Sequence, residues 1–159
     1  MENIFIDIQN RLTSAVPEIQ WIDIDEGQFD AFGENAPVDY PCVLVGFPSA
    51  DFSNAGRRTQ TAEVNITVKV AFKLWESFST KVPNRAVTFE HFAILKKVMT
   101  ALHAMGGENY NGLVRVRFEK NTSVDPKLYE ITYRCQMRDF DTIKDYAHEL
   151  IENLEIIKN

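Results

Sequence analysis

Apolar residues recur with two different periods along the chain, and each change of period marks a boundary between a helix and a strand. The first stretch is helical, with one row of apolar residues: Ile4, Phe5, Ile8, Leu12 and Val16. The row stops at Pro17, whose ring blocks a helix interior. The pattern therefore predicts one amphipathic helix at the start of the chain.

Residues 19–29 have the pattern of a strand followed by a turn. Trp21, Ile22 and Ile24 are its candidates for burial, and Gly27 is the expected turn residue. Residues 30–41 are rich in Gly, Pro, Asn and Asp, a composition that predicts a loop.

The next segments predict a long hairpin. Residues 42–47, CVLVGF, are expected to form a short strand covered on both faces, and residues 48–58, PSADFSNAGRR, a polar connection. Residues 59–74 follow as a strand whose apolar side chains share one parity: Ala62, Val64, Ile66, Val68, Val70, Phe72 and Leu74. At roughly 3.3 Å per residue, this strand would reach about 50 Å. We therefore expect its apolar row to outrun the core of one subunit and to be covered by another.

Helical spacing returns after Pro83. The apolar stripe consists of Phe92, Leu95, Val98, Met99, Leu102 and Met105. It predicts a central helix, which Gly106 and Gly107 are expected to terminate as a C-cap.

The last third of the chain predicts two paired strands and a helix. Residues 112–120 and 128–140 alternate, each with one apolar face, and residues 142–157 carry a helical apolar stripe. The expected fold for residues 1–159 is a single α+β domain. It has a mainly antiparallel sheet of four to five strands, two to three helices on one face and one long hairpin arm.

Composition narrows the classes of function. The chain has 159 residues with 45% hydrophobic content, enough for one core, and its formal charge of −6 opposes non-specific binding to nucleic acid. It contains no apolar run long enough to cross a bilayer, so a cytoplasmic protein without membrane contact is expected. The two cysteines, Cys42 and Cys135, are expected to be buried thiols rather than a disulfide or metal ligands.

Candidate chemistry is sparse. The three histidines, His91, His103 and His148, lack the spacing of a helical zinc site, and we expect solvated or capping side chains. Residues 23–27, DIDEG, lack the ligand spacing of a calcium loop. The sequence shows no glycine-framed nucleophile and no phosphate-binding loop, so we predict no catalytic residue, metal or cofactor.

Arginines form the one charged grouping of interest. By strand parity, four of them are expected on one exposed sheet face: Arg115, Arg117, Arg134 and Arg138. Either they form a solvated face neutralised by Glu119 and Glu130, or they meet an acidic surface of another subunit. Arg57, Arg58 and Phe52 of the polar connection are further candidates for a subunit interface.

The complete pattern resembles the tail terminator, or tail completion, proteins of long-tailed bacteriophages and prophages. The shared features are a first helix ending in SAVPEI, a YP dipeptide entering the strand YPCVLVGF, and the long strand QTAEVNITVKVAF. They continue with LKKVMTALHAMGG, VRVRFE and YRCQMRDFD, so that the resemblance covers roughly residues 4–141. The closing helix, residues 142–157, is longer than expected of that family and leaves a related neck or baseplate role open.

The resemblance implies a non-enzymatic structural protein of virion assembly. In that family six copies close into a ring on the end of the tail tube, stop its polymerisation and join it to the head connector. The implied partners are the chain itself, the tail tube protein and the head-tail connector protein, in the host cytoplasm during assembly and then in the virion tail. Two alternatives remain: a small cytosolic enzyme or ligand-binding domain, and a nucleic-acid-binding module that uses the arginines.

Overall fold

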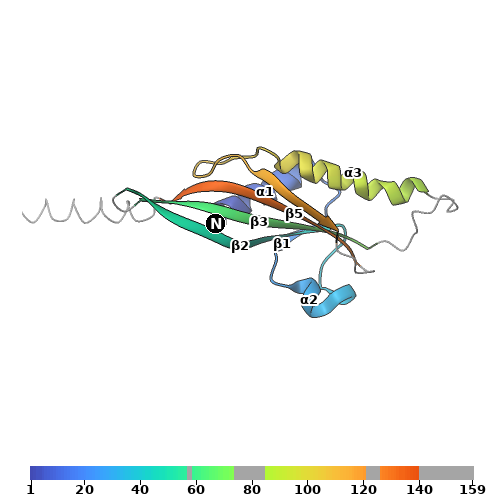
Figure 1. Ribbon diagram of the computed structural model, residues 1–159. Coiled ribbons are helices and arrows are strands. Elements are labelled where there is room, and N and C mark those ends of the chain that lie inside the picture. The colour runs from blue at the N-terminus through green and yellow to red at the C-terminus, as the bar shows by residue number, and fades with distance from the viewer. Residues whose placement is uncertain (57–58, 74–84, 121–125, 140–159) are drawn as a thin grey trace, which may run out of the picture.

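The computed structural model describes residues 1–56, 59–73, 85–120 and 126–139, which form an α+β fold around one sheet (Figure 1). Five strands lie in the order β1-β2-β3-β5-β4, with β1 parallel to β2 and all other neighbours antiparallel. The strands are β1 (Trp21–Ile24), β2 (Cys42–Gly56), β3 (Thr59–Phe72), β4 (Val114–Lys120) and β5 (Lys127–Asp139). The helices are α1 (Glu2–Ala15), α2 (Gln28–Phe32) and α3 (Arg85–Leu102), with a 3-10 helix over Gly33–Asn35. The predicted fold class is confirmed.

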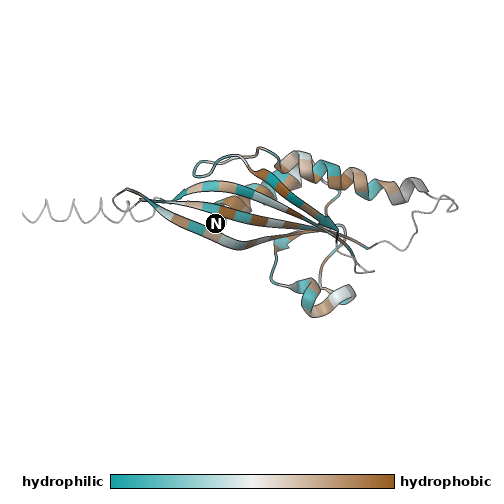
Figure 2. Ribbon diagram, viewed as in Figure 1, coloured by the Kyte–Doolittle hydropathy of each residue, from teal (hydrophilic) through white to brown (hydrophobic). Residues whose placement is uncertain are grey.

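Helices α1 and α3 pack on one face of the sheet, called here the helix-covered face. The buried side chains they contribute are Ile4, Ile8 and Leu12 from α1, and Leu95, Val98, Ala101 and Leu102 from α3. Strand β5 adds Ile131 and Tyr133 to the same core. The alternation of apolar and polar residues along the strands is visible in Figure 2 and accounts for this one-sided burial.

The apolar row of β3 lies inside this core, which corrects the expectation that it outruns the subunit. From Ala62 to Phe72 its members are at most 3% exposed. The two helices cover different ends of the row. At one end the amino group of Met1 lies 4.0 Å from the sulfur of Met137, which pairs with Ala62, and at the other the ring of Phe72 lies 5.2 Å from that of His91. Because α1 covers one end of the row and α3 covers the other, the two helices together bury a row that is too long for a single helix to cover.

Among the described residues, the opposite face of the sheet, called here the open face, is covered near α2 only. There Cys42, Ala71 and Leu128 form a small buried cluster beneath Phe29 and Tyr40. Farther along the strands this face carries polar side chains that bond to one another across strands. For example, the Asn65 amide donates to Ser49 Oγ at 3.0 Å, and the hydroxyls of Ser53 and Thr61 lie 2.8 Å apart.

Strand β2 is much longer than its sequence predicts. Residues 48–56 continue the strand and pair with β3 from Ser49 opposite Asn65 to Gly56 opposite Thr59, so the predicted polar connection is wrong up to Gly56. Residues 57 and 58 lie outside the described residues. The hairpin end, defined as residues 51–56 and 59–61, projects past α1 in Figure 1.

Residues 19–41 also differ from the prediction. Trp21 and Ile24 are 37% and 42% exposed rather than buried, because β1 is an edge strand with one neighbour. Part of the predicted loop forms α2 and the 3-10 helix. Gly27 lies at the predicted turn and has a φ of 80°, a conformation that favours glycine.

Helix α3 ends before the glycine pair. Its last residue is Leu102, and Ala104 adopts the left-handed conformation with a φ of 59°. Ala104 donates its N–H to the carbonyl of Leu113 at 2.9 Å, and Leu113 donates to the carbonyl of Met105 at 2.8 Å. These bonds to the segment entering β4 stabilise the left-handed Ala104, so the chain leaves the helix through Ala104 rather than through the predicted caps Gly106 and Gly107. The predicted helix over residues 142–157, and Leu74, lie outside the described residues.

Candidate subunit interface

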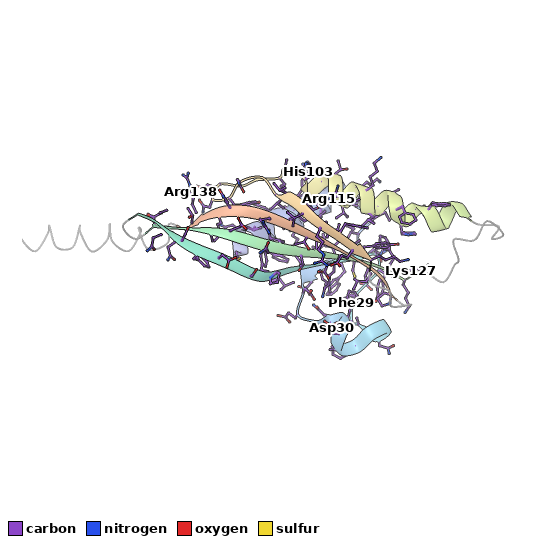
Figure 3. The ribbon with its side chains drawn as sticks, in the orientation of Figure 1. Phe29, Asp30, His103, Arg115, Lys127 and Arg138 are labelled. Atoms are coloured by element: carbon purple, nitrogen blue, oxygen red, sulfur yellow. The ribbon has the colours of Figure 1, made fainter. Side chains whose placement is uncertain are left out.

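The four arginines expected on one sheet face are divided between two faces. Register between β4 and β5 shifts at Val116, so Arg115 is opposite Tyr133 whereas Arg117 is opposite Thr132. Because a one-residue shift moves a side chain to the other face, Arg115 lies on the helix-covered face, where it donates to the sulfur of Met99. Figure 3 shows Arg115 beside α3 and Arg138 nearer the hairpin end.

The arginines of the open face have partners within the chain. Arg134 lies 3.2 Å from the carboxylate of Glu63 and donates to the amide oxygen of Asn65 at 3.4 Å. Arg117 pairs with Glu119 at 2.7 Å, with both side chains largely exposed. The contacts of Arg134 support the solvated-face alternative for that residue. The exposed pair of Arg117 is of a kind that contributes little to stability, so it does not hold Arg117 away from another acidic partner.

Phe52, one of the predicted interface residues, lies on β2 near the tip of the hairpin. It is opposite Ala62 in the hairpin end, and it is 51% exposed because that part of the hairpin extends beyond α1. Arg57 and Arg58 lie outside the described residues.

Strand β4 carries the predicted candidates Arg115 and Arg117 and also exposed apolar residues that were not predicted as part of an interface. It is the edge strand beside β5, and all of its residues are exposed. Val114, Val116 and Phe118 are 54%, 47% and 47% exposed. Because every second residue here is apolar, the sequence predicts that one face of the strand is buried. The position of β4 at the sheet edge and the bulge at Val116 explain why these side chains are exposed instead. Exposed β-branched and aromatic residues on an open sheet edge are a ready site for a partner.

Both cysteines are buried free thiols, as predicted. Burial raises the pKa of Cys42 to about 12 and that of Cys135 to about 11. Both thiols therefore stay protonated near neutral pH and are poor nucleophiles.

Two histidines can be compared with the prediction of solvated or capping side chains. His103 is exposed, as expected. His91 is buried, which corrects the prediction: its ring lies 4.2 Å from that of Phe92, and its Nε2 is 3.3 Å from the hydroxyl of Tyr129. His148 lies outside the described residues.

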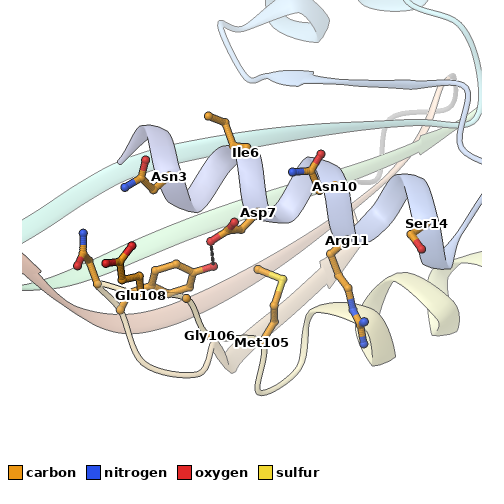
Figure 4. A pocket seen from close by; sticks show the side chains of 12 residues that line it. Asn3, Ile6, Asp7, Asn10, Arg11, Ser14, Met105, Gly106 and Glu108 are labelled. Atoms are coloured by element: carbon orange, nitrogen blue, oxygen red, sulfur yellow. Dashed lines mark hydrogen bonds between the residues drawn. The ribbon is translucent and has the colours of Figure 1, made fainter.

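A cleft of about 630 Å³ separates α1 from the segment that follows α3 (Figure 4). Tyr110 donates to the carboxylate of Asp7 at 2.9 Å across its floor. Burial, and then the bond to Asp7, raise the pKa of Tyr110. A Cβ at Gly107 would lie 2.3 Å from the Tyr110 ring and 2.7 Å from Asp7, so this contact requires glycine.

Two further observations concern the described part of the chain. No helix there is long and apolar enough to span a membrane. Nor do three or more His, Cys, Asp or Glu side chains among those residues gather closely enough to hold a metal ion.

Comparison with known proteins gives similarities among solved structures. No protein-family model matches the chain, and no curated protein is similar to it. Among solved structures, it aligns with a chain of the virion of a native gene transfer agent (GTA) particle, with a TM-score of 0.47 and 13% sequence identity. The alignment covers 84% of this chain and 92% of the other.

Proposed function

We propose that the chain is a structural subunit of a phage-like tail, without enzymatic activity. In this function several copies, six by analogy with tail terminators, form a ring on the end of the tail tube. The ring stops tube polymerisation and presents a surface to the head connector. The sequence motifs that resemble tail terminator proteins support this proposal, because they run in the same order from the first helix to the last strand.

The projecting hairpin end is the observation that carries the proposal. Residues 51–56 are exposed on both faces, and Asp51 is their one charged residue. A strand pair without a covering layer is marginally stable in water and exposes backbone and apolar groups such as Phe52. In a ring on the tail tube, a neighbouring subunit or the tube itself would cover these exposed groups of the hairpin end.

Tube polymerisation tests this function. Purified tail tube protein from the same particle is polymerised with and without the chain, and tube lengths are measured by electron microscopy. The proposal predicts tubes that stop growing and carry a ring at one end. Phe52→Ser should weaken capping, whereas Ile6→Ser, which changes an exposed apolar residue on α1, should not. Tubes of unchanged length without end-bound protein would contradict the proposal.

A second candidate function, small-ligand binding, is favoured by the cleft beside α1. Its lining combines Asp7, Arg11 and Asn10 with the ring of Tyr110, and converging polar groups on an apolar wall are typical of ligand sites. Screening small molecules by NMR would test it, with the Tyr110 ring signals as the reporter. Ligands that shift those signals in the wild-type chain but not in Asp7→Asn would favour this candidate over the ring.

A further inference from the structure

One lateral edge of the sheet is acidic. It consists of β1, the following turn and α2, and is called here the acidic edge. Its charged residues are Asp23, Asp25, Glu26 and Asp30. No Lys or Arg occurs in the sequence between Arg11 and Arg57. Lys69 from β3 pairs with Asp25 at 2.7 Å, which leaves the exposed carboxylates of Glu26 and Asp30 at the surface.

The acidic edge also exposes apolar side chains. Trp21 and Ile24 lie on β1, and Phe32 at the end of α2 is 57% exposed. Large apolar groups beside unpaired charges of one sign are typical of protein interfaces.

The other lateral edge has the opposite charge. It is strand β4, called here the basic edge, and it carries Arg115, Arg117 and Lys120 against one acid, Glu119. The exposed apolar residues of β4 lie among these cations. The two edges of the sheet are therefore complementary. Each exposes apolar side chains, and the charges of one edge attract those of the other.

The backbone of β1 is protected where it does not face β2. Asp25 donates its backbone N–H to the carbonyl of Val45 on β2. The preceding residue, Ile24, donates its backbone N–H to the side chain of Asp23 at 2.8 Å. The carbonyl of Ile24 accepts from the amide of Gln28 at 2.8 Å, and that of Ile22 from Gln9 at 3.5 Å. Because side chains occupy these backbone groups, the acidic edge is suited to contact through side chains rather than to adding a strand.

We propose that the basic edge of one copy of the chain binds the acidic edge of the next copy. This inference rests on the proposed ring and names the surfaces that build it. The contact joins two different patches, so each bound copy leaves one basic and one acidic edge free. Such a head-to-tail contact either closes into a ring or continues as a filament. Pairing of two basic edges is disfavoured because it would place like charges together.

Two charge-reversal variants test the contact. The first, Arg115→Glu with Arg117→Glu, makes both edges acidic. The second, Glu26→Lys with Asp30→Lys, leaves the two new lysines and Lys69 against Asp23 and Asp25, so both edges carry a net positive charge. Asp23 and Asp25 stay unchanged because they bond within the subunit. Glu90→Lys with Glu108→Lys is the matched control, since it reverses two exposed acids, one on α3 and one in the segment after it, that belong to neither edge. Circular dichroism checks that each variant is folded, and sedimentation velocity over a concentration series measures assembly.

Each edge variant alone should associate roughly 100-fold more weakly than wild type, because like charges meet at every contact. An equal mixture of the two should recover assembly, with the variants alternating around a ring. The control variant should assemble as wild type does. Assembly of the second variant alone at wild-type strength, or no recovery in the mixture of folded variants, would overturn the head-to-tail contact. A wild-type chain that stays monomeric at every concentration would overturn it as well.

The outcomes separate this inference from the proposed function. If wild type caps tubes and forms rings but both edge variants do so equally well, the edges are wrong and the ring function stands. If the mixture recovers assembly but tube lengths stay unchanged, the edge contact stands and the tail function fails.

Discussion

Strands β3 and β4 have the same alternation of apolar and polar residues, but the apolar side chains of β3 are buried and those of β4 are exposed. In β3 every second side chain from Ala62 to Phe72 is buried, whereas in β4 Val114, Val116 and Phe118 are about half exposed. β3 lies in the middle of the sheet beneath two helices, and β4 lies at an edge with a bulge. Alternation alone therefore does not decide burial, because strand order determines whether a face is covered and a bulge changes which side chains share a face.

The comparison predicts its largest effect on stability. Ile66→Ala removes part of a fully buried side chain in β3 and should lower the free energy of unfolding by about 2–5 kcal/mol, measured by urea denaturation. The control Val116→Ala in β4, measured on dilute protein, should change it by less than about 0.5 kcal/mol. Similar losses for both variants would show that β4 is buried in solution.

A smaller effect is expected at alkaline pH from the thiol of Cys42. Its pKa rises from an ordinary value of 9.0 to about 12 in the folded chain, so from pH 9 upward the unfolded chain loses a proton that the folded chain keeps. The contribution of this thiol is fully present below pH 9 and decreases as pH rises toward 12. The free energy of unfolding should fall by up to about 1.4 kcal/mol per pH unit in that range.

Urea denaturation at about pH 8 and about pH 10 measures this effect. Cys42→Ala should show a shallower pH dependence than wild type, because it lacks one of the groups whose pKa is higher in the folded chain. Equal pH dependence in both proteins would mean that the thiol is not buried as described.

The smallest effect is expected within β4 itself. Arg117→Ala removes an exposed ion pair with Glu119 and should change stability by less than about 0.5 kcal/mol. A double-mutant cycle with Glu119→Ala measures the coupling. A coupling of several kcal/mol would contradict the description of β4 as a solvated edge.

Much of the fold could be predicted from periodicity. The first helix, the central helix, the pairing of β4 with β5 and the hairpin of β2 with β3 follow from apolar spacing and proline positions. The continuation of β2 through residues 48–56 could not be predicted, because the composition of PSADFSNAG is typical of turns. Pairing with β3 supplies the backbone hydrogen bonds and overrides local propensity.

The candidate interface was predictable only in part. Phe52 and the arginines of β4 are exposed, as the sequence indicates. The bulge at Val116 places Arg115 on another face than Arg117, and a strict alternation in sequence gives no sign of a bulge. The acidic edge was missed because Trp21 and Ile24 were expected in the core, and their exposure depends on β1 having one neighbour.

Cysteine crosslinking between copies detects the contact of the basic edge with the acidic edge. Val116→Cys and Ile24→Cys place exposed thiols on the two edges, while Cys42 and Cys135 are buried and protonated. With a short bifunctional maleimide, a mixture of the two single variants should yield covalent dimers that contain one copy of each, and the variant with both changes should yield a ladder of higher oligomers. Crosslinks between two Val116→Cys copies, with none between Val116→Cys and Ile24→Cys, would contradict the account.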